Sequence, residues 1–462
     1  MGQPLALTAT LARADGPAVA VPSGASTDIG ARLDALPFCR MRLAVLAVTT
    51  LALFADIAEV ALGNALGAIF QAPPHVMTPT ELSLFLAAIF AGGAAGAPAF
   101  GALGDRTGRR LALQLALAAV AAGSLGAALS ATTPALIGFR FLSGLGIGAC
   151  PPLIAAYLAD VMPPRVRGRM VCFCAGLAFL GAPAIIFLMR AASPETLGVA
   201  GWRWALGCGG VLAVIAAALL HWLPESPRWL AAAGRLAEAE SALRRFGGPA
   251  AERAAPAVID DRPPAAPERQ PGRGAHSPLP LLCGLYLLSP WATIGFPLMS
   301  GAVMVAKRFS IGDSVVAAGL IMVGPVIGNL LMASAIDRIP RRASLVLAAA
   351  VMACLGLLFA AASNFVSLVI LGIAFAFASA IYASVLGVYA AEIVPTGSRA
   401  SRTAFAWGIG RLTSIFVPLV FVASMHHLGV WAMFVLIALA LIASIALVVV
   451  AGPPGRSSQS VG

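Results

Sequence analysis

Long apolar runs constrain the fold of this chain more than any other feature. Each is about 20 residues long, the length that a helix needs to cross roughly 30 Å of hydrocarbon. The runs are continuous and do not alternate, which predicts transmembrane helices and not a barrel. They form two groups of six around a polar stretch, and the predicted spans are 42–63, 82–103, 112–130, 135–158, 170–190, 204–223, 279–300, 314–335, 343–361, 366–389, 402–423 and 430–451.

Composition and charge agree with an integral membrane protein in the lipid bilayer. Only 11% of the 462 residues are charged, whereas a soluble domain carries about 25%. The net charge of +11 is mostly arginine in alternate loops, which the positive-inside rule explains without a nucleic-acid partner. We expect both termini and the central loop to be cytoplasmic. The arginine-rich and alanine-rich composition suggests a GC-rich bacterium, so the predicted location is the inner (plasma) membrane.

The predicted organisation follows from these runs. Residues 1–40 lack helical periodicity and predict a loose tail. Within the central loop, Leu223–Phe246 predicts a helix that starts with proline, and Gly247–Pro278 predicts a flexible linker. The predicted units are a cytoplasmic tail over 1–41, a six-helix bundle over 42–223, a cytoplasmic linker with a short helix over 224–278, a second six-helix bundle over 279–451 and a cytoplasmic tail over 452–462.

Two charged motifs recur at one offset. The turn GALGDRTGRR (101–110) has a weaker copy, ASAIDRIPRR (333–342), and YLADVMPPRVR (157–167) has the copy YAAEIVPTGSR (389–399). Asp105 and Asp337 are as far apart as Tyr157 and Tyr389, 232 residues in each case. Two motif pairs in one register indicate an internal duplication. Because each half holds an even number of spans, both halves insert the same way up, as in secondary transporters built from parallel repeats.

These motifs resemble those of the major facilitator superfamily from Met41 onward. GALGDRTGRR is similar to the signature loop between helices 2 and 3 of that superfamily, and RFLSGLGIG (140–148) resembles its helix 4 motif. PESPRWL (224–230) resembles a stretch shared by sugar porters, organic-ion transporters and metabolite:proton symporters. The resemblance implies an all-α membrane protein with 12 transmembrane helices in two pseudo-symmetric six-helix bundles.

A finer placement is suggested by the first span. Asp56 and Glu59 resemble the acidic pair of aromatic-acid and metabolite:proton symporters, although Ile57 and Ala58 replace the usual glycine and aromatic residue. The region from Ala391 through Arg411 and Pro418 also resembles that branch. Sugar porters usually show a glutamine-rich helix 7, whereas residues 285–301 contain no glutamine. The expected branch is therefore the aromatic-acid and metabolite symporters.

Charges that occur in only one half are the candidates for substrate and proton chemistry, because a charge within the bilayer is costly and is functional by default. Asp56 and Glu59 lie mid-span, and their counterparts Leu288 and Trp291 are uncharged. Two carboxylates three residues apart in a low dielectric cannot easily both stay ionised. They are the predicted proton-coupling residues. The alternative is that one of them forms a structural ion pair with an arginine.

Two arginines inside spans are candidate substrate ligands. Arg411 lies mid-span, and its guanidinium plane matches a carboxylate in a bidentate way. The alternative for Arg411 is an ion pair with Asp56 or Glu59. Arg140 is also a candidate substrate ligand. The alternative is a structural role, either as a partner of the first helix or at an outer gate. Weaker candidates are polar or aromatic residues on the cavity helices, for which packing is the competing explanation: Tyr286, Trp291, Asn329, Tyr382 and Trp407.

The duplicated charges are predicted to gate the transporter. Asp105 is expected to reach the start of the eleventh span near Arg402, and Asp337 the start of the fifth near Arg169. Such pairs would latch the two halves on the cytoplasmic side and break when that side opens. The predicted gating residues are Asp105, Arg106, Arg109, Arg110, Asp160, Arg167, Arg169, Asp337, Arg338, Arg341, Arg342, Glu392, Arg399 and Arg402.

The predicted function is proton-coupled uptake of a small organic anion, such as an aromatic or other carboxylic acid, by a protein that works as a monomer. A drug or cation exporter and a sugar-type porter are the alternatives on the same fold. The sequence shows no Walker A loop, GxSxG or HExxH motif, and its seven cysteines form no paired metal motif. An enzyme is therefore not expected, nor is a metal or a cofactor other than the coupling proton.

Overall fold

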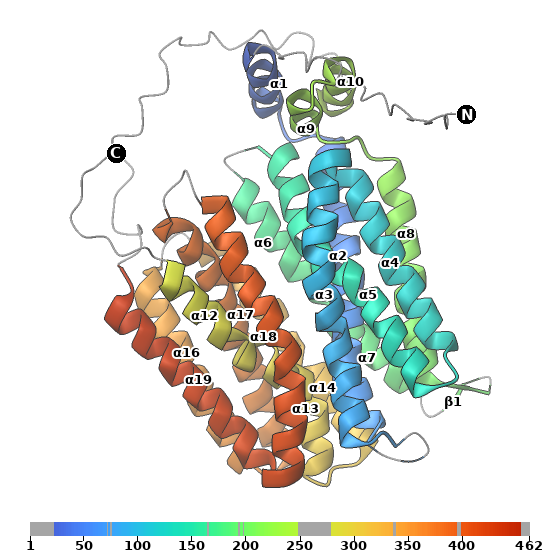
Figure 1. Cartoon of the computed structure of the whole chain (residues 1–462), viewed down its shortest axis with the longest axis vertical. Coiled ribbons are helices and arrows are strands. Elements are labelled where there is room, and N and C mark those ends of the chain that lie inside the picture. Colours follow the sequence, from blue (N-terminus) through green and yellow to red (C-terminus); the bar gives the residue numbers. More distant parts are fainter. Residues whose placement is uncertain are drawn as a thin grey trace, which may run out of the picture.

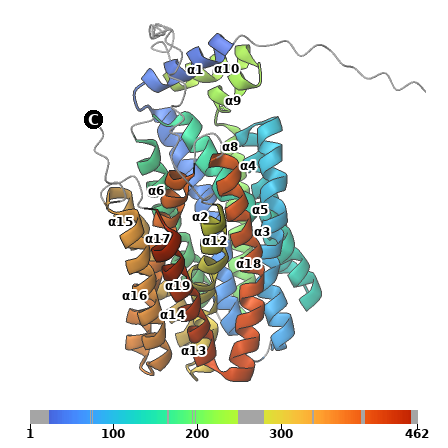
Figure 2. The same ribbon diagram turned by 60° about the vertical axis from the view of Figure 1, so that its left-hand side comes forward.

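Two bundles of membrane-length helices lie side by side, with a layer of small helices across one end (Figure 1, Figure 2). The structure is a computed structural model, and it describes residues 23–71, 73, 76–163, 166–192, 195–196, 198–247, 279–335, 339–394 and 399–453. Within these residues twelve spans are long and apolar enough to cross a membrane. The all-α fold with twelve transmembrane helices is therefore confirmed.

The N-terminal bundle holds six of the spans, and one of them consists of two helices. Its elements are α2 (Arg40–Ile69), α3 (Pro79–Thr107), α4 (Arg109–Leu129), α5 (Thr133–Val161), α6 (Arg167–Ala178), α7 (Gly181–Ala191) and α8 (Gly201–His221). A two-stranded antiparallel hairpin, β1 (Glu195–Thr196) and β2 (Val199–Ala200), joins α7 to α8. The end of the bundles that carries this hairpin is called the far end here.

The C-terminal bundle holds the other six spans, two of which are broken. Its helices are α12 (Leu279–Thr293), α13 (Gly295–Ala306), α14 (Ile311–Ile321), α15 (Val323–Ala335), α16 (Arg341–Ala361), α17 (Phe365–Ile393), α18 (Arg399–Leu428) and α19 (Val430–Ala451). The layer at the opposite end, called the near end, consists of α1 (Ser23–Ala35), α9 (Pro227–Ala232) and α10 (Leu236–Gly247).

Helix α1 was not expected, because residues 1–40 were predicted to be a loose tail. It packs on α9 and α10 through Ile29, which joins a buried cluster around Trp229 and Leu230. An ion pair of 2.5 Å links Asp34 to Arg228. Local periodicity is weak in this segment, so the helix depends on tertiary contacts that the sequence pattern does not reveal. Residues 1–22 and the predicted linker from 248 to 278 lie outside the described residues.

Buried Arg42 connects this layer to the membrane helices. Its guanidinium donates to the carbonyls of Leu33, Leu36 and Pro37 at the end of α1, at 2.6 to 2.8 Å, and to the Val161 carbonyl at the end of α5, at 2.9 Å. The last carbonyls of a helix have no partner within the helix. Arg42 therefore caps two helix ends with one cation, a favourable place for a positive charge.

The predicted helix over Leu223–Phe246 is divided into two. Gly234 lies between α9 and α10 with a φ of 77°, in the left-handed region that glycine adopts at little cost. The chain therefore turns there, and α10 packs back against α9.

Within the N-terminal bundle, α3 and α5 touch backbone to backbone. A Cβ atom added to Gly96 would lie 1.9 Å from the Leu145 carbonyl oxygen, and one added to Gly144 would lie 2.3 Å from the carbonyl oxygen of Ile89. Small residues let transmembrane helices approach this closely, and dispersion contacts then hold them together. The glycines thus fix the wall of the bundle that faces the central cavity.

Candidate functional site

A cavity of about 280 Å³ lies between the two bundles. The N-terminal bundle contributes one wall through α2, α3, α5, α7 and the break before α7, and the C-terminal bundle contributes the other through α12, α13, α15, α17 and α18. The lining residues are Asp56, Ile57, Val60, Ala61, Asn64, Ile89, Phe90, Gly93, Ile147, Phe179, Ala182, Thr293, Ile294, Pro297, Leu298, Met322, Pro325, Ala376, Ser379, Ala380, Ala383 and Arg411. The interface between the two halves is where secondary transporters bind their substrate.

The three broken spans all meet at this cavity. The breaks separate α6 from α7, α12 from α13 and α14 from α15, and each is followed by a proline: Pro183, Pro297 and Pro325. Proline has no N–H to donate to the carbonyl of the residue four positions earlier, and its ring clashes with that carbonyl. Residues at all three breaks, Phe179, Ile294 and Met322, line the cavity.

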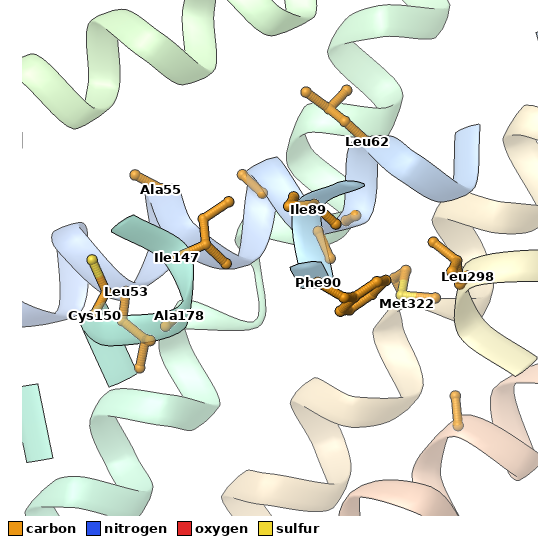
Figure 3. Close-up of a cluster of buried hydrophobic side chains, with 14 of the residues drawn as sticks. Leu53, Ala55, Leu62, Ile89, Phe90, Ile147, Cys150, Ala178, Leu298 and Met322 are labelled. Atoms are coloured by element: carbon orange, nitrogen blue, oxygen red, sulfur yellow. The ribbon is translucent and has the colours of Figure 1, made fainter. Parts of the chain in front are cut away.

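The walls of the cavity are mostly apolar. Figure 3 shows the cluster of buried hydrophobic side chains in this region, in which Ile89 and Phe90 of the N-terminal bundle lie near Met322 and Leu298 of the C-terminal bundle. Five of the 22 lining residues have polar side chains: Asp56, Asn64, Thr293, Ser379 and Arg411. Two of the five are engaged elsewhere, since Thr293 Oγ1 donates to the Ser289 carbonyl at 2.9 Å and Asn64 bonds to α13.

Asp56 and Arg411 face the cavity from opposite bundles, and their charges attract each other across it. Asp56 is 3% exposed. Neither Asp56 Oδ1 nor Arg411 Nε has a hydrogen-bond partner among the described residues. The guanidinium of Arg411 also lies over the Trp407 ring, 4.9 Å from its centroid. A carboxylate and a guanidinium that each keep one unbonded polar atom in an apolar cavity are poised to bind a polar ligand or a proton.

Glu59, one turn farther along α2, points into the N-terminal bundle. Its carboxylate pairs with Arg140 of α5 at 2.5 Å, and both side chains are at most 1% exposed. Arg140 also donates to the Glu59 carbonyl at 3.3 Å and lies over the Phe85 ring. The two acids therefore do not act on one face as expected. Asp56 faces the cavity, and Glu59 forms the ion pair with arginine that was weighed as the alternative.

The weaker substrate candidates lie outside the cavity lining. Tyr286 packs edge-on against Trp407, with ring centroids 5.9 Å apart, and Trp291 packs against Phe421. The Asn329 amide donates to the Pro325 carbonyl and accepts from Ser384. Tyr382 is fully buried. Packing and local hydrogen bonds, the competing explanation, account for their positions in this structure.

Each described ion pair among the predicted gating residues joins two residues of the same bundle. Asp105 pairs with Arg109 at 2.5 Å, and Arg109 lies 3.8 Å from Asp160. This differs from the expected contact of Asp105 with the start of α18, because a spacing of four residues places Arg109 beside Asp105. In the other bundle, Arg341 pairs with Glu392 at 3.1 Å.

Other predicted gating residues are placed as follows. Arg342 donates to the Val449 carbonyl at 2.6 Å. Asp337 and Arg338 lie outside the described residues, as do the side chains of Arg399 and Arg402. Arg106, Arg167 and Arg169 are described at the near end, on the last turn of α3 and the first turn of α6.

Sequence reasoning missed Glu225 as part of the near-end cluster. Its carboxylate accepts from the backbone N–H groups of Arg109 and Arg110 at 3.0 to 3.1 Å, at the start of α4. An acid at a helix N-terminus satisfies donors that have no partner within the helix. Glu225 belongs to the PESPRWL motif, and an acid in that motif is the signal that could have found the contact.

Asn64 was also missed. Its Oδ1 accepts from Gly301 N–H at 2.8 Å, and its Nδ2 donates to Ser300 Oγ at 3.0 Å, so the side chain joins α2 to α13 across the two bundles. An amide within an apolar span is the signal that could have found it.

Comparison with known proteins agrees with the fold. The family described as "Sugar (and other) transporter" matches residues 57–454. The Bacillus subtilis metabolite transport protein YyaJ is 28% identical, over 93% of this chain and 96% of that protein. The arabinose-proton symporter of the same organism is 36% identical over 38% of each chain. The xylose transporter XylE of E. coli, in a partially occluded inward-open conformation, has a TM-score of 0.73 at 19% identity and covers 92% of this chain and 100% of its own.

These matches correct the finer placement made from the sequence. The aromatic-acid branch is not supported, because the family match is to sugar transporters. The lack of glutamine in residues 285–301 was a poor criterion, since one helix decides ligand chemistry within a family and not membership of it. The protein is a multi-pass membrane transporter and not an enzyme, and transporters of this kind need no cofactor. The chain belongs to the sugar (and other) transporter family and has the major facilitator fold.

Proposed function

We propose that the protein is a proton-coupled symporter of the sugar-porter type that takes up a small organic anion by rocker-switch alternating access. One observation carries the proposal: Asp56 and Arg411, from opposite bundles, face the same largely apolar cavity. The cavity therefore holds one carboxylate and one guanidinium. Asp56 can take up a proton, and Arg411 can bind a substrate anion in place of Asp56.

Charge balance in the cavity would couple the substrate to a proton. In the empty cavity the charge of Arg411 is offset by Asp56. A substrate carboxylate bound bidentately to Arg411 would leave two carboxylates beside one guanidinium in apolar surroundings, which is unfavourable. Protonation of Asp56 restores neutrality. One proton thus accompanies each carboxylate, and neither ligand is stably loaded alone.

Glu59 is the second proton-binding group of the proposal. Its ion pair with Arg140 links α2 to α5 and is sealed from the cavity. Neutralising Glu59 would release a guanidinium whose main partner it is, and so would loosen the contact between these helices. Protonation is thereby connected to helix packing, which is the part of the fold that must change during transport.

The charge distribution favours one orientation in the membrane, and the proposed uptake then sets the direction of transport. The positive-inside rule favours an orientation in which the near end, with the arginines of α9 and α10, faces the cytoplasm. The near-end clusters around Asp105 and Glu392 would act as gates that exchange partners between conformational states. Substrate would load from the far end and leave at the near end, and one chain contains every group that this cycle needs.

A sugar or polyol is the second candidate substrate. The family description and the arabinose-proton symporter favour it. The cavity walls favour the anion, since Asp56, Asn64, Thr293, Ser379 and Arg411 are the only polar side chains among the 22 described lining residues, and Asn64 and Thr293 are bonded elsewhere. A sugar bound there would leave several hydroxyls without partners, at a cost for each. In a drug or cation exporter, Asp56 would bind the cation. The positive charge of Arg411 in the same cavity would repel that cation, which disfavours this alternative.

Uptake into proteoliposomes distinguishes these substrates. We expect labelled benzoate or another small carboxylate to accumulate under an inward proton gradient, and Arg411→Gln to lower its binding about 100-fold or more. Two charge-assisted hydrogen bonds contribute about 3 kcal/mol or more in total. Asp56→Asn is expected to abolish accumulation and its pH dependence while exchange of internal for external substrate continues.

The exposed pair of Arg235, just before α10, and Glu238 on α10 supplies the matched control. Arg235→Gln and Glu238→Gln remove the same charges at 47% and 58% exposure, far from the cavity, and should leave uptake unchanged. Because Arg235 lowers the pKa of the Glu238 carboxyl, this control acid stays ionised throughout the neutral range. Accumulation of xylose, arabinose or inositol that survives Arg411→Gln would support the sugar substrate and refute the anion.

A further inference from the structure

The two acids of α2 each have a partner on α5, and the two partners differ in charge. Glu59 pairs with the guanidinium of Arg140, whereas the carboxylate of Asp56 accepts a hydrogen bond from the thiol of Cys150. As the first and fourth spans, α2 and α5 run in opposite directions, so the later acid on α2 meets the earlier partner on α5. One acid is thus held by a cation and the other by a neutral donor.

Cys150 lies behind Asp56 and outside the lining of the central cavity. Its side chain is fully buried, whereas Asp56 lines the cavity. Figure 3 shows Cys150 within the cluster of buried hydrophobic side chains. The Oδ1 atom of Asp56 has no hydrogen-bond partner among the described residues. A proton or a ligand in the cavity can therefore reach the acid without displacing the thiol.

The contact with Cys150 differs in kind from the attraction between Asp56 and Arg411. Arg411 acts on Asp56 from α18 of the opposite bundle, and Glu59 acts on it from the same helix. The described lining residues of α3, α7, α12, α13, α15 and α17 are uncharged. When the two bundles rock against each other, the distance from Asp56 to Arg411 changes. Cys150 belongs to the same bundle as Asp56, so its hydrogen bond can persist through the cycle.

The thiol and the two prolines that follow it occur in one half of the chain only. The residues found 232 positions after Cys150, Pro151 and Pro152 are Tyr382, Ala383 and Ser384. Because proline has no N–H, the carbonyls of residues 147 and 148 lose their usual partners within α5. The helix is therefore less firmly bonded around Cys150, which lets the thiol follow changes in the charge of the acid.

A thiol is a weak hydrogen-bond donor compared with a hydroxyl. A donor that bonds to the ionised form of an acid favours that form, and a hydroxyl would favour it more strongly. Cys150 therefore gives the ionised carboxylate of Asp56 a partner in apolar surroundings without holding it so firmly that a proton cannot be taken up.

We propose that Cys150 is a positioning residue for the coupling acid, and that its thiol donates to the ionised carboxylate of Asp56 and sets the pH at which this carboxylate takes up a proton. The proposal deepens the proposed function, from which it takes Asp56 as the coupling acid.

Infrared difference spectroscopy of the purified protein follows both groups without substrate or a proton gradient. The C=O stretch of a protonated carboxyl reports the proton on Asp56 as the pH is varied, and its band is identified by its loss in Asp56→Asn. The S–H stretch falls in a spectral window free of other protein bands and reports the hydrogen bond of a thiol. The band of Cys150 is the one that Cys150→Ser removes.

We expect Cys150→Ala to raise the midpoint pH of the Asp56 titration by about one unit, because the ionised carboxylate loses a donor. Cys150→Ser should lower the midpoint by about half a unit or more, because the hydroxyl is the stronger donor. In proteoliposomes the pH at which accumulation is half-maximal should move in the same two directions. Opposite shifts from two small side chains distinguish a hydrogen bond from packing.

The S–H band and a second buried thiol complete the test. In the parent protein the Cys150 band should move to lower frequency as Asp56 ionises, and in Asp56→Asn it should stay in place. Cys174 of α6 is also buried, but it bonds to Thr49 and Thr50. The control Cys174→Ala should therefore leave the midpoint unchanged.

Equal midpoints in the parent protein, Cys150→Ala and Cys150→Ser would overturn the proposal, and so would shifts in one direction, which a change of packing produces. A Cys150 S–H band that does not respond to the charge of Asp56 would overturn it even if neither variant folds. If the midpoints shift as expected but no carboxylate accumulates in proteoliposomes, the proposed substrate is wrong and the positioning role stands.

Discussion

Glu59→Ala is expected to lower the free energy of unfolding by about 3–5 kcal/mol, because it leaves the guanidinium of Arg140 buried without its ionic partner. Glu59 and Arg140 are 2.5 Å apart and at most 1% exposed, inside a membrane bundle where water cannot replace the lost carboxylate. Unfolding of the purified protein in bicelles, followed by a steric trap or by denaturant, measures the change. The exposed pair on α10 is the control, and Glu238→Ala should have no comparable effect.

Replacing both partners separates the structural role of this pair from its role in coupling. We expect Glu59→Leu combined with Arg140→Met to recover most of the lost stability, because apolar residues of similar volume replace a buried ion pair at little cost. The stable double variant should still exchange substrate but should no longer accumulate it. Accumulation equal to that of the parent protein would show that the pair is only structural, and Asp56 would remain as the sole coupling acid.

Gly96→Ala is expected to cost about 3 kcal/mol or more and to yield little monodisperse protein, since the added Cβ would lie 1.9 Å from the Leu145 carbonyl oxygen. The clash is with backbone, so no rotamer change relieves it, and α3 must separate from α5. Fluorescence-detected size exclusion and thermal unfolding of the extracted protein measure the effect.

The matched control lies on the same helix. Gly101 has no atom within 4 Å of the position of an added Cβ, so Gly101→Ala should be neutral or stabilise α3 by about 0.5–1 kcal/mol. If the two variants behave alike, the close approach of α3 and α5 is not what holds this bundle together.

The twelve spans were predictable because membrane helices are set by the length and continuity of apolar runs, which are local properties. The breaks were not. Pro183, Pro297 and Pro325 follow breaks, yet Pro98, Pro151 and Pro418 lie inside continuous helices. A proline therefore marks where a helix can break, and the surrounding packing decides whether it does.

The candidate site was predictable in part. The absence of counterparts in the other half singled out Asp56 and Arg411, and the structure brings both to one cavity. The sequence could not show that Glu59 turns away from the cavity. Two residues three apart on a helix point in directions that still differ by about 60°. Nor could it pair Asn64 with Ser300, since contacts between the bundles depend on tertiary packing. The short motifs shared among branches likewise predicted the superfamily but misplaced the branch.

Proton movement that accompanies substrate is the decisive measurement of symport. Proteoliposomes with an internal pH dye are given labelled benzoate or another small carboxylate, then xylose, arabinose or a cationic amine, so that proton and substrate flux are measured together. We expect one proton to enter with each carboxylate. Asp56→Asn should lose the proton flux but keep exchange, and Arg411→Gln should lose both. Carboxylate entering without protons, or proton flux driven only by sugars and unaffected by Arg411→Gln, would contradict the proposed symport.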